Sequence, residues 1–215
     1  MANPRKVALV VGANGVIGGN LIAHLSTLDD WQIIGVSRRG GVPGDLSGDR
    51  IRYISADLLD AEDTRAKLSG LSHVTHIFYA AYQDRPTWAE LVPPNLAMLT
   101  NVVDAIEPIA PGLEHVSLMQ GYKVYGAHLG PFKTPARESD PHHMPPEFNV
   151  DQQEFLARRQ VGKAWTWSAL RPSVVIGFGL GNPMNLAIVL AVYASMSAAL
   201  GLPLRFPGKP GAYDS

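Results

Sequence analysis

Three glycines at three-residue intervals are the first candidate for chemistry in the chain. Gly12, Gly15 and Gly18 directly follow an apolar run that ends at Val11. Glycines so placed let a strand turn tightly into a helix, bring the backbone close to a pyrophosphate and aim the helix N-terminus at its negative charge. The expected contacts of a dinucleotide in this loop are Gly12, Asn14, Gly15, Val16, Ile17 and Gly18. The same spacing is compatible with a plain strand-to-helix turn, so the residues elsewhere in the chain must distinguish the two interpretations.

A second polar group ends the next apolar run, 31–36. There Ser37, Arg38 and Arg39 stand where a protein that binds NAD normally carries an acidic residue for the adenosine ribose hydroxyls. Arginine suits a 2′-phosphate instead, because its planar guanidinium pairs with phosphate through two hydrogen bonds. The two arginines therefore favour NADP(H) as the cofactor. The alternative is a solvated pair at a strand end.

Apolar runs alternate with stretches of helical periodicity along most of the chain. The expected strands are Lys6–Val11, Trp31–Val36, Ile51–Ser55, Thr75–Ala80, Glu114–Leu118 and Ala164–Leu170. The expected helices are Gly15–Leu28, Asp60–Leu68, Pro86–Ile106 with an interruption at Pro93-Pro94, Pro146–Gln160 and Leu186–Leu200. This alternation predicts the α/β class, with a Rossmann-like doubly wound parallel sheet and helices on both faces.

Further candidates follow the expected strands, because ligands of an open parallel sheet bind beyond the carboxyl ends of its strands. Asp57 and Leu58 follow the third strand. The aspartate there could accept a hydrogen bond from an adenine amino group or serve as a helix cap or turn residue. Ala80, Ala81 and Tyr82 follow the fourth strand, where the small side chains leave room for a ribose.

Composition narrows the classes of function. The net charge of the 215 residues is −1, so charge steers the chain neither to nucleic acid nor to a membrane surface. The chain has no cysteine, which excludes thiolate metal sites and disulfides, and its histidine pairs lack a further ligand at metal spacing. Its first residues lack a signal-peptide pattern. We expect a cytoplasmic protein without a metal, in which the apolar helix 186–200 is buried against another helix, since it is shorter than the roughly 20 residues of a membrane span.

The residues after the fifth strand resemble those of a known family. Gly121–Phe132 reads GYKVYGAHLGPF and resembles the G-x-K-x-Y-x-G-P-F region of the progesterone 5β-reductase and iridoid synthase-like enone reductases, a branch of the extended short-chain dehydrogenases/reductases. Other matches are spread along nearly the whole chain: 36–39, 74–79, 101–105, 165–168 with 171–172, and 177–178 with 184–186. On the basis of these motifs, the chain is identified as a bacterial-type member of that family.

This resemblance implies an NADPH-dependent 1,4-reduction of an enone, with a small-molecule carbonyl compound as the substrate. Lys123 matches the family lysine that faces the growing negative charge on the carbonyl oxygen and that also contacts the cofactor. Tyr125 is a further candidate donor. The strand-end residues implied to run under the nicotinamide are Arg171, Pro172, Ser173, Val174 and Val175.

One position departs from the family pattern. The family's second donor is a tyrosine in an N-x-Y-Y-D-like stretch, and Val150 stands in its place, with no proton to donate. The first of three open interpretations is a reductase in which Lys123 is helped by Tyr122, Tyr125 or Asn149. The second is a reductase of aldehydes or ketones with another proton donor, and the third is a protein that binds NADP without turnover.

The resemblance also implies a domain division. Relatives continue past the position of Ser215 and build a substrate-covering domain from the later residues. We expect an NADP-binding Rossmann domain at 1–180, with a long active-site loop at 120–150, and the start of a truncated substrate-binding region at 181–215. A nucleotide-sugar epimerase-like activity is a further alternative, although Val150 and Glu154 replace the usual Y-x-x-x-K pair. A homodimer is one assembly open to such a chain.

Overall fold

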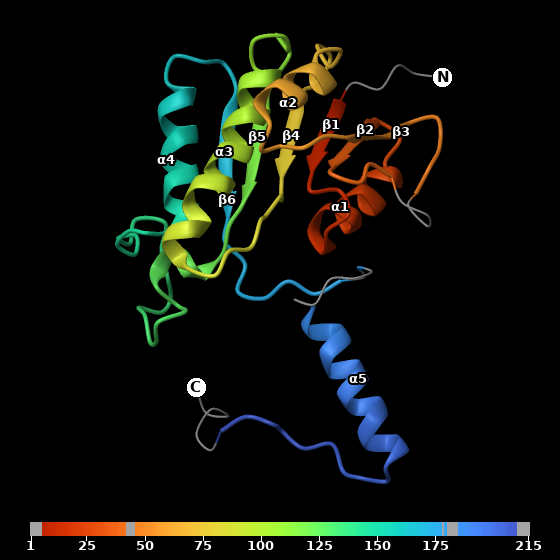
Figure 1. Ribbon diagram of the computed structural model, residues 1–215, viewed down its shortest axis with the longest axis vertical. Helices are drawn as coiled ribbons and strands as arrows, with labels where there is room; N and C mark the ends of the chain where they lie inside the picture. The colour runs from red at the N-terminus through yellow and green to blue at the C-terminus, as the bar shows by residue number, and fades with distance from the viewer. Residues whose placement is uncertain (1–5, 42–45, 178, 180–184, 210–215) are drawn as a thin grey trace.

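A computed structural model describes residues 6–41, 46–177, 179 and 185–209. Six strands form one parallel sheet in the order β3-β2-β1-β4-β5-β6, as Figure 1 shows. They are β1 (Lys6–Val11), β2 (Trp31–Ser37), β3 (Ile51–Ser55), β4 (His76–Tyr79), β5 (His115–Met119) and β6 (Thr166–Leu170). The strand order reverses between β1 and β4, which creates the crevice at the strand ends where doubly wound folds bind ligands.

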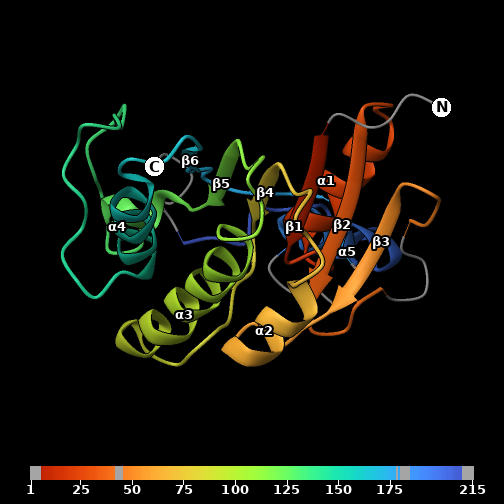
Figure 2. The same ribbon diagram turned by 90° about the horizontal axis from the view of Figure 1, so that it is seen from above.

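Helices cover both faces of this sheet. They are α1 (Val16–Ser26), α2 (Ala61–Leu68), α3 (Trp88–Ile106) and α4 (Phe148–Gln160), while α5 (Leu186–Ala199) follows the sheet. Figure 2 shows α1 on one face and α2 and α3 on the other. The β1 strand serves both sides, because Leu9 and Val11 pack under α2, α3 and α4 whereas Ala8 and Val10 pack under α1. The predicted Rossmann-like doubly wound sheet is thus confirmed.

The prolines of α3 do not interrupt it, contrary to the prediction. The helix runs through Pro93 and Pro94, and Thr87 and Glu90 form a capping box at its start. The two missing N–H groups would have bonded to carbonyls of the first turn, at Ala89 and Glu90, and both of these residues are exposed to water. The loss is therefore confined to one solvated turn, and burial of the long apolar face that follows outweighs it.

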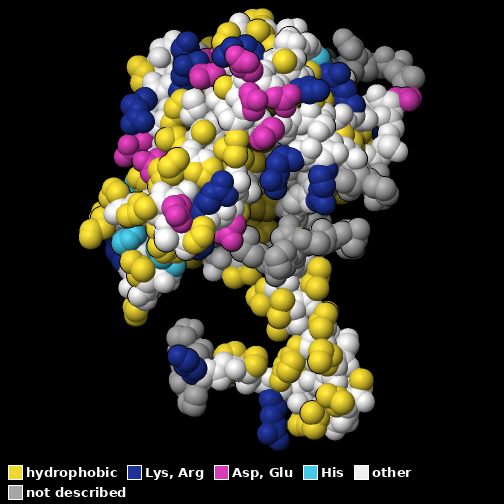
Figure 3. Space-filling model, in the orientation of Figure 1, with side chains coloured by type: hydrophobic (Ala, Val, Ile, Leu, Met, Phe, Trp, Pro, Cys, Tyr) yellow, Lys and Arg dark blue, Asp and Glu magenta, His cyan; other side chains and the backbone are white. Residues whose placement is uncertain are grey.

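The prediction of a buried helix at 186–200 was wrong. Helix α5 is apolar on all sides, yet Ser197 is its one buried residue and apolar side chains such as Val189 (55% exposed) and Met196 (59% exposed) face outward. Figure 3 shows these hydrophobic side chains gathered along α5, which stands apart from the sheet. Within the described residues, no other helix packs on it. The part of the chain that the structure describes contains no helix long and apolar enough to cross a membrane.

Part of the predicted organisation lies outside the described residues. The expected boundary between residues 180 and 181 falls there, as do Phe178 and Met184 of the quoted motifs. The division into 1–180 and 181–215 therefore stays a prediction.

Candidate functional site

The turn from β1 to α1 requires glycine at two of its three glycine positions. Gly12 has a φ of 89°, and a Cβ atom there would lie 2.8 Å from the backbone of Ala80 and Ala81. A Cβ atom on Gly18 would overlap the carbonyl oxygen of Gly12 and lie 2.8 Å from its carbon. The loop is therefore packed backbone against backbone between α1 and the end of β4. This close packing is what the spacing predicts for a dinucleotide loop.

Gly15 leaves the start of α1 open. It is the N-cap residue, no side chain caps the helix, and no acidic residue lies in its first turn. The first amides of a helix point along its axis without intrahelical partners, so this end attracts an anion. An added Cβ atom on Gly15 would meet only the Gly12 oxygen, at 3.3 Å, which leaves space in front of the turn. These features fit a pyrophosphate group.

The end of β2 brings the predicted ribose contacts beside this turn. The Gly12 and Ala13 amides both donate to the Val36 carbonyl, at 2.9 and 3.1 Å. Ser37 Oγ donates to Asn14 Oδ1 and so ties the two loops together. Beyond it Arg38 and Arg39 are exposed, and neither is in an ion pair with a described residue. Two uncompensated guanidinium groups here suit a phosphate ligand.

The candidates after β3 and β4 have roles in the fold as well. Asp57 accepts the Leu59 amide at 3.1 Å, which is the turn role that the sequence left open, and Leu58 is buried. The backbone of Ala80 and Ala81 packs closely against Gly12. Tyr82 donates its hydroxyl proton to Asp84 at 2.9 Å, and burial together with that bond raises its pKa to about 12.

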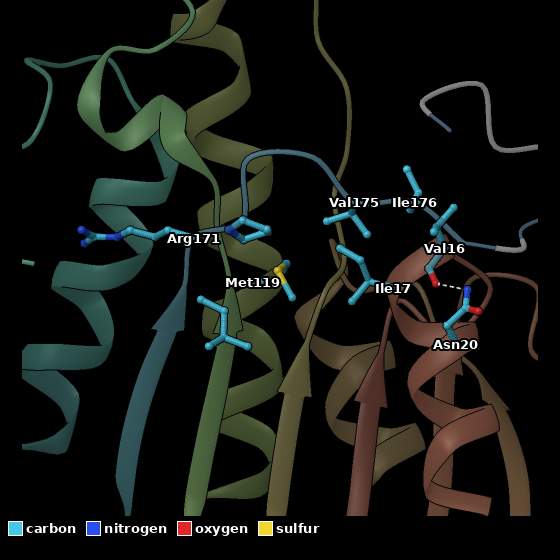
Figure 4. Close-up of a pocket in the computed structure, with 9 residues that line it drawn as sticks. Val16, Ile17, Asn20, Met119, Arg171, Val175 and Ile176 are labelled. Carbon is cyan, nitrogen blue, oxygen red and sulfur yellow. Dashed lines mark hydrogen bonds between the residues drawn. The ribbon is translucent and has the colours of Figure 1, made fainter. Parts of the chain in front are cut away.

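A cavity of about 490 Å³ lies beyond the ends of β5 and β6. Its lining is mostly apolar and comes from α1, the two strand ends and the segment that follows β6: Val16, Ile17, Asn20, Met119, Leu170, Arg171, Pro172, Val175 and Ile176. Figure 4 shows Ile17 and Val175 close together at this cavity, while the Arg171 side chain extends away toward α4. Asn20 donates to the Val16 carbonyl at 2.6 Å. An apolar wall of this kind fits one face of a nicotinamide ring.

Lys123 lies on the short 3₁₀ helix η1 (Tyr122–Tyr125), away from the lining of this cavity. It is exposed, and its Nζ is 4.8 Å from the centroid of the Trp88 ring at the start of α3, a cation–π contact. His128 packs on the same ring at 4.3 Å between centroids. Burial and the nearby positive charges of His143 and Lys123 lower the pKa of His128. The lysine side chain is therefore held against an aromatic ring.

The side chain of Arg171 anchors the 120–150 loop. Its guanidinium donates to Gln120 Oε1 at 3.1 Å, to Gln153 Oε1 at 2.5 Å and to the Tyr125 hydroxyl oxygen, and it lies 4.9 Å from the Tyr125 ring. His142 Nε2 is 3.3 Å from it. The cluster joins β5, η1, the loop and α4. Arg171 is also among the residues that line the cavity, so its side chain links the segment that follows β6 to the η1 helix that carries Lys123.

The first turn of α4 holds the position where the family tyrosine is missing. Val150 is half-buried there, and it does not line the cavity. Asn149 is 4% exposed, and its carbonyl accepts from Gln120 Nε2 at 2.6 Å. Glu147 caps the helix with a side chain that is 1% exposed, and burial raises the pKa of its carboxyl.

The structure thus brings together one part of the predicted site. The crevice at the strand ends is reached by the glycine loop, by Ser37, Ala80 and Ala81, and by the segment that follows β6. Within that segment Ser173 and Val174 are exposed and do not line the cavity. The lining of the cavity does not include Lys123, Tyr125 or Val150. The sequence analysis missed three residues that line the cavity. Met119 and Leu170 could have been found because they end β5 and β6, and Asn20 because it lies one helical turn after Val16. No pattern marked Glu147.

The parallel sheet, with its glycine turn and its apolar cavity at the strand ends, defines a Rossmann-like fold. The chain aligns over 99% of its length with an (S)-8-oxocitronellyl enol synthase of Nepeta racemosa at 39% identity, covering 57% of that protein. It aligns over 97% of its length with a 3-oxo-Δ(4,5)-steroid 5β-reductase of Arabidopsis thaliana at 38% identity, covering 56% of that protein. Residues 49–213 match the PRISE-like Rossmann-fold domain, and the chain belongs to this family.

Solved structures agree on the fold. The UDP-glucose 4-epimerase of Bifidobacterium longum, in complex with NAD⁺ and UDP, superposes with a TM-score of 0.72 at 18% identity, over 88% of this chain and 62% of that one. At this identity the likeness concerns the fold alone. The chain spans little more than half the length of the curated relatives that it matches.

Proposed function

We propose that the chain is an NADPH-dependent reductase that adds hydride to the carbon β to the carbonyl of an enone. Family membership supports an oxidoreductase, and the name of the Arabidopsis relative describes reduction of a 3-oxo-Δ(4,5) steroid. The observation that carries the proposal is Lys123, which the chain keeps within the family motif and which lies exposed on η1, in the segment that follows β5. The substrate is a small molecule, and its identity would depend on residues around η1 and α4.

We assign the cofactor-binding site to residues whose geometry fits a dinucleotide. Gly12, Gly15 and the open end of α1 would hold the pyrophosphate, and Arg38 with Arg39 would hold a 2′-phosphate. The apolar residues around Ile17 and Val175 would exclude water from one face of the ring. When bound, the reduced nicotinamide supplies the hydride.

Lys123 would act on the substrate oxygen. Hydride addition to an enone moves the π electrons toward the carbonyl oxygen, and an ammonium group aimed at this oxygen stabilises the charge that develops. The cation–π contact with Trp88 restrains the side chain of this lysine. Depletion of NADPH by the chain with a panel of cyclic and acyclic enones tests the proposal. An absence of turnover with every enone would refute it.

Replacing both Arg38 and Arg39 by alanine should weaken NADPH binding about tenfold or more, because two charge-assisted contacts with the 2′-phosphate are lost. NADH lacks this phosphate, so its affinity should change little. Fluorescence titration of both cofactors measures the difference. Arg52→Ala is the matched control, an exposed arginine on β3 that should leave both affinities unchanged. Equal affinity of the native chain for NADPH and NADH would contradict the assignment.

A second candidate function rests on Val150. Since valine cannot replace a tyrosine proton donor, a chain that binds NADP(H) without turnover is the alternative. It requires tight cofactor binding and no consumption of NADPH with any carbonyl compound. Multiple turnovers that disappear in Lys123→Ala would exclude it.

A further inference from the structure

Arg171 directly follows β6 and lines the cavity, yet its side chain extends away from the cavity toward α4 (Figure 4). Its guanidinium group contacts four side chains: Gln120 directly after β5, Tyr125 on η1, His142 further along the 120–150 loop and Gln153 on α4. One side chain therefore joins the end of β6 to η1, to the loop and to the helix that follows the loop.

All four partners of the guanidinium group are uncharged. His142 Nε2 lies 3.3 Å from Arg171 Nη2 and 3.4 Å from Gln153 Nε2, and both of these groups can only donate. The imidazole nitrogen must therefore accept, which makes His142 neutral. No acidic side chain of the described residues forms an ion pair with Arg171. The guanidinium group thus makes charge-assisted bonds whose directions its planar fork fixes, an arrangement that holds its partners in place.

The segments held in this way carry the residues on which the proposed reaction depends. Tyr125 lies two residues after Lys123 on the same short helix. Gln120, which accepts from Arg171 Nε at 3.1 Å, in turn donates from its Nε2 to the Asn149 carbonyl at 2.6 Å. Gln120 and Asn149 are both buried, and Asn149 precedes Val150 in the first turn of α4. Arg171 is therefore connected by hydrogen bonds to η1 and to the start of α4.

The proposed reaction requires an exact distance between two of these segments. The hydride donor of the nicotinamide must reach the β carbon of the enone while Lys123 faces the oxygen of the same molecule. The nicotinamide is assigned to the cavity that the segment after β6 lines, whereas the lysine lies on η1. A displacement of about 1 Å between groups of this kind can lower a rate about a hundredfold.

We infer that Arg171 is the positioning residue that sets η1, and with it Lys123, relative to the nicotinamide site. This inference rests on the proposed function. Arg171 acts through Tyr125, Gln120 and Gln153, and its guanidinium group touches neither the cofactor nor the substrate.

Arg171→Ala is the first variant that tests this role. With the enone that the native chain reduces best, we expect kcat to fall about a hundredfold. NADPH affinity should stay within about twofold, since the side chain extends away from the cavity. Arg171→Lys should recover only part of kcat, because an ammonium group cannot reproduce the planar fork. Arg158→Ala is the matched control, an exposed arginine on α4 that pairs with Glu154 and should leave kcat unchanged.

Combining Arg171→Ala with Tyr125→Phe separates positioning from proton donation by Tyr125. Tyr125→Phe alone removes the hydroxyl acceptor of Arg171 and should lower kcat at least threefold. In the Arg171→Ala background the same change should have no further effect, because the contact is already lost. An equal loss in both backgrounds would mean that Tyr125 acts independently, and it would overturn the inference, as would native kcat in Arg171→Ala.

Cleavage of the 120–150 loop by trypsin tests the inference without any substrate. The exposed side chains of Lys123 and Lys133 offer cleavage sites on this loop. We expect cleavage there to be at least tenfold faster in Arg171→Ala than in the native chain, with circular dichroism unchanged. Cleavage at the native rate would overturn the inference. Faster cleavage in a chain that reduces no enone would refute the proposed function alone, and the placement of η1 by Arg171 would stand.

If Arg171→Ala fails to fold, Tyr125→Phe takes its place in the same assay. It removes a single acceptor and keeps the ring that lies 4.9 Å from the guanidinium carbon. We expect faster cleavage of the loop in this variant as well, and a native rate would overturn the inference.

Discussion

Replacement of Gly18 by alanine is expected to abolish NADPH binding, with a loss of more than about a hundredfold. The new Cβ atom would overlap the carbonyl oxygen of Gly12, whose own backbone is already packed against Ala80. Relief therefore requires the turn to move away from the end of β4, which also moves the amides assigned to the pyrophosphate. Overpacking of this kind costs about 3 kcal/mol or more of stability, because no flexible side chain can yield.

The neighbouring glycine makes the control for this prediction. A Cβ atom on Gly19 would meet the Ala13 oxygen at 3.5 Å, an ordinary contact. Gly19→Ala should thus keep NADPH affinity and raise helix stability by up to about 1 kcal/mol, the difference in helix propensity between glycine and alanine. Urea unfolding and fluorescence titration of both variants measure the two effects. Similar behaviour of Gly18→Ala and Gly19→Ala would contradict the packing argument.

Lys123→Ala is expected to lower kcat for enone reduction by 10² to 10³. This factor corresponds to the roughly 3 to 4 kcal/mol that one well-placed donor contributes to stabilisation of an oxyanion. Cofactor affinity should fall much less, since the side chain lies outside the lining of the apolar cavity and rests on Trp88. Steady-state kinetics with the best enone, combined with NADPH titration, separates the two quantities.

Lys133→Ala is the matched control on the same loop, because this lysine is exposed and pairs with Asp140. It should leave kcat unchanged. Loss of the reaction in both variants would indicate a disordered loop rather than a lost donor. Unchanged kcat in Lys123→Ala would remove the lysine from the mechanism.

The sheet was predictable because its strands depend on local pattern. Apolar-rich runs marked all six, and the glycine turn lies where it was predicted, with backbone contacts at Gly12 and Gly18 that a side chain would break. Prolines misled the prediction in α3, since a capping box and a long buried face outweigh two lost hydrogen bonds. The exposure of α5 depends on what packs against it, which its apolar composition cannot reveal.

The candidate site was only half predictable, for a related reason. Strand-end residues such as Val175 follow from topology, whereas side-chain directions in the long loop depend on tertiary partners. Arg171 occupies the expected position but turns its guanidinium to Tyr125 and Gln153. Glu147 had no sequence signal at all, because a buried carboxyl is recognised only by its surroundings.

The most direct test of the central claim uses NADPH that carries deuterium at the transferable position of the nicotinamide. The chain is incubated with this cofactor and an enone, and the product is analysed by NMR. We predict multiple turnovers with deuterium on the carbon β to the carbonyl. Deuterium on the carbonyl carbon, or no transfer to any enone, would contradict the claim.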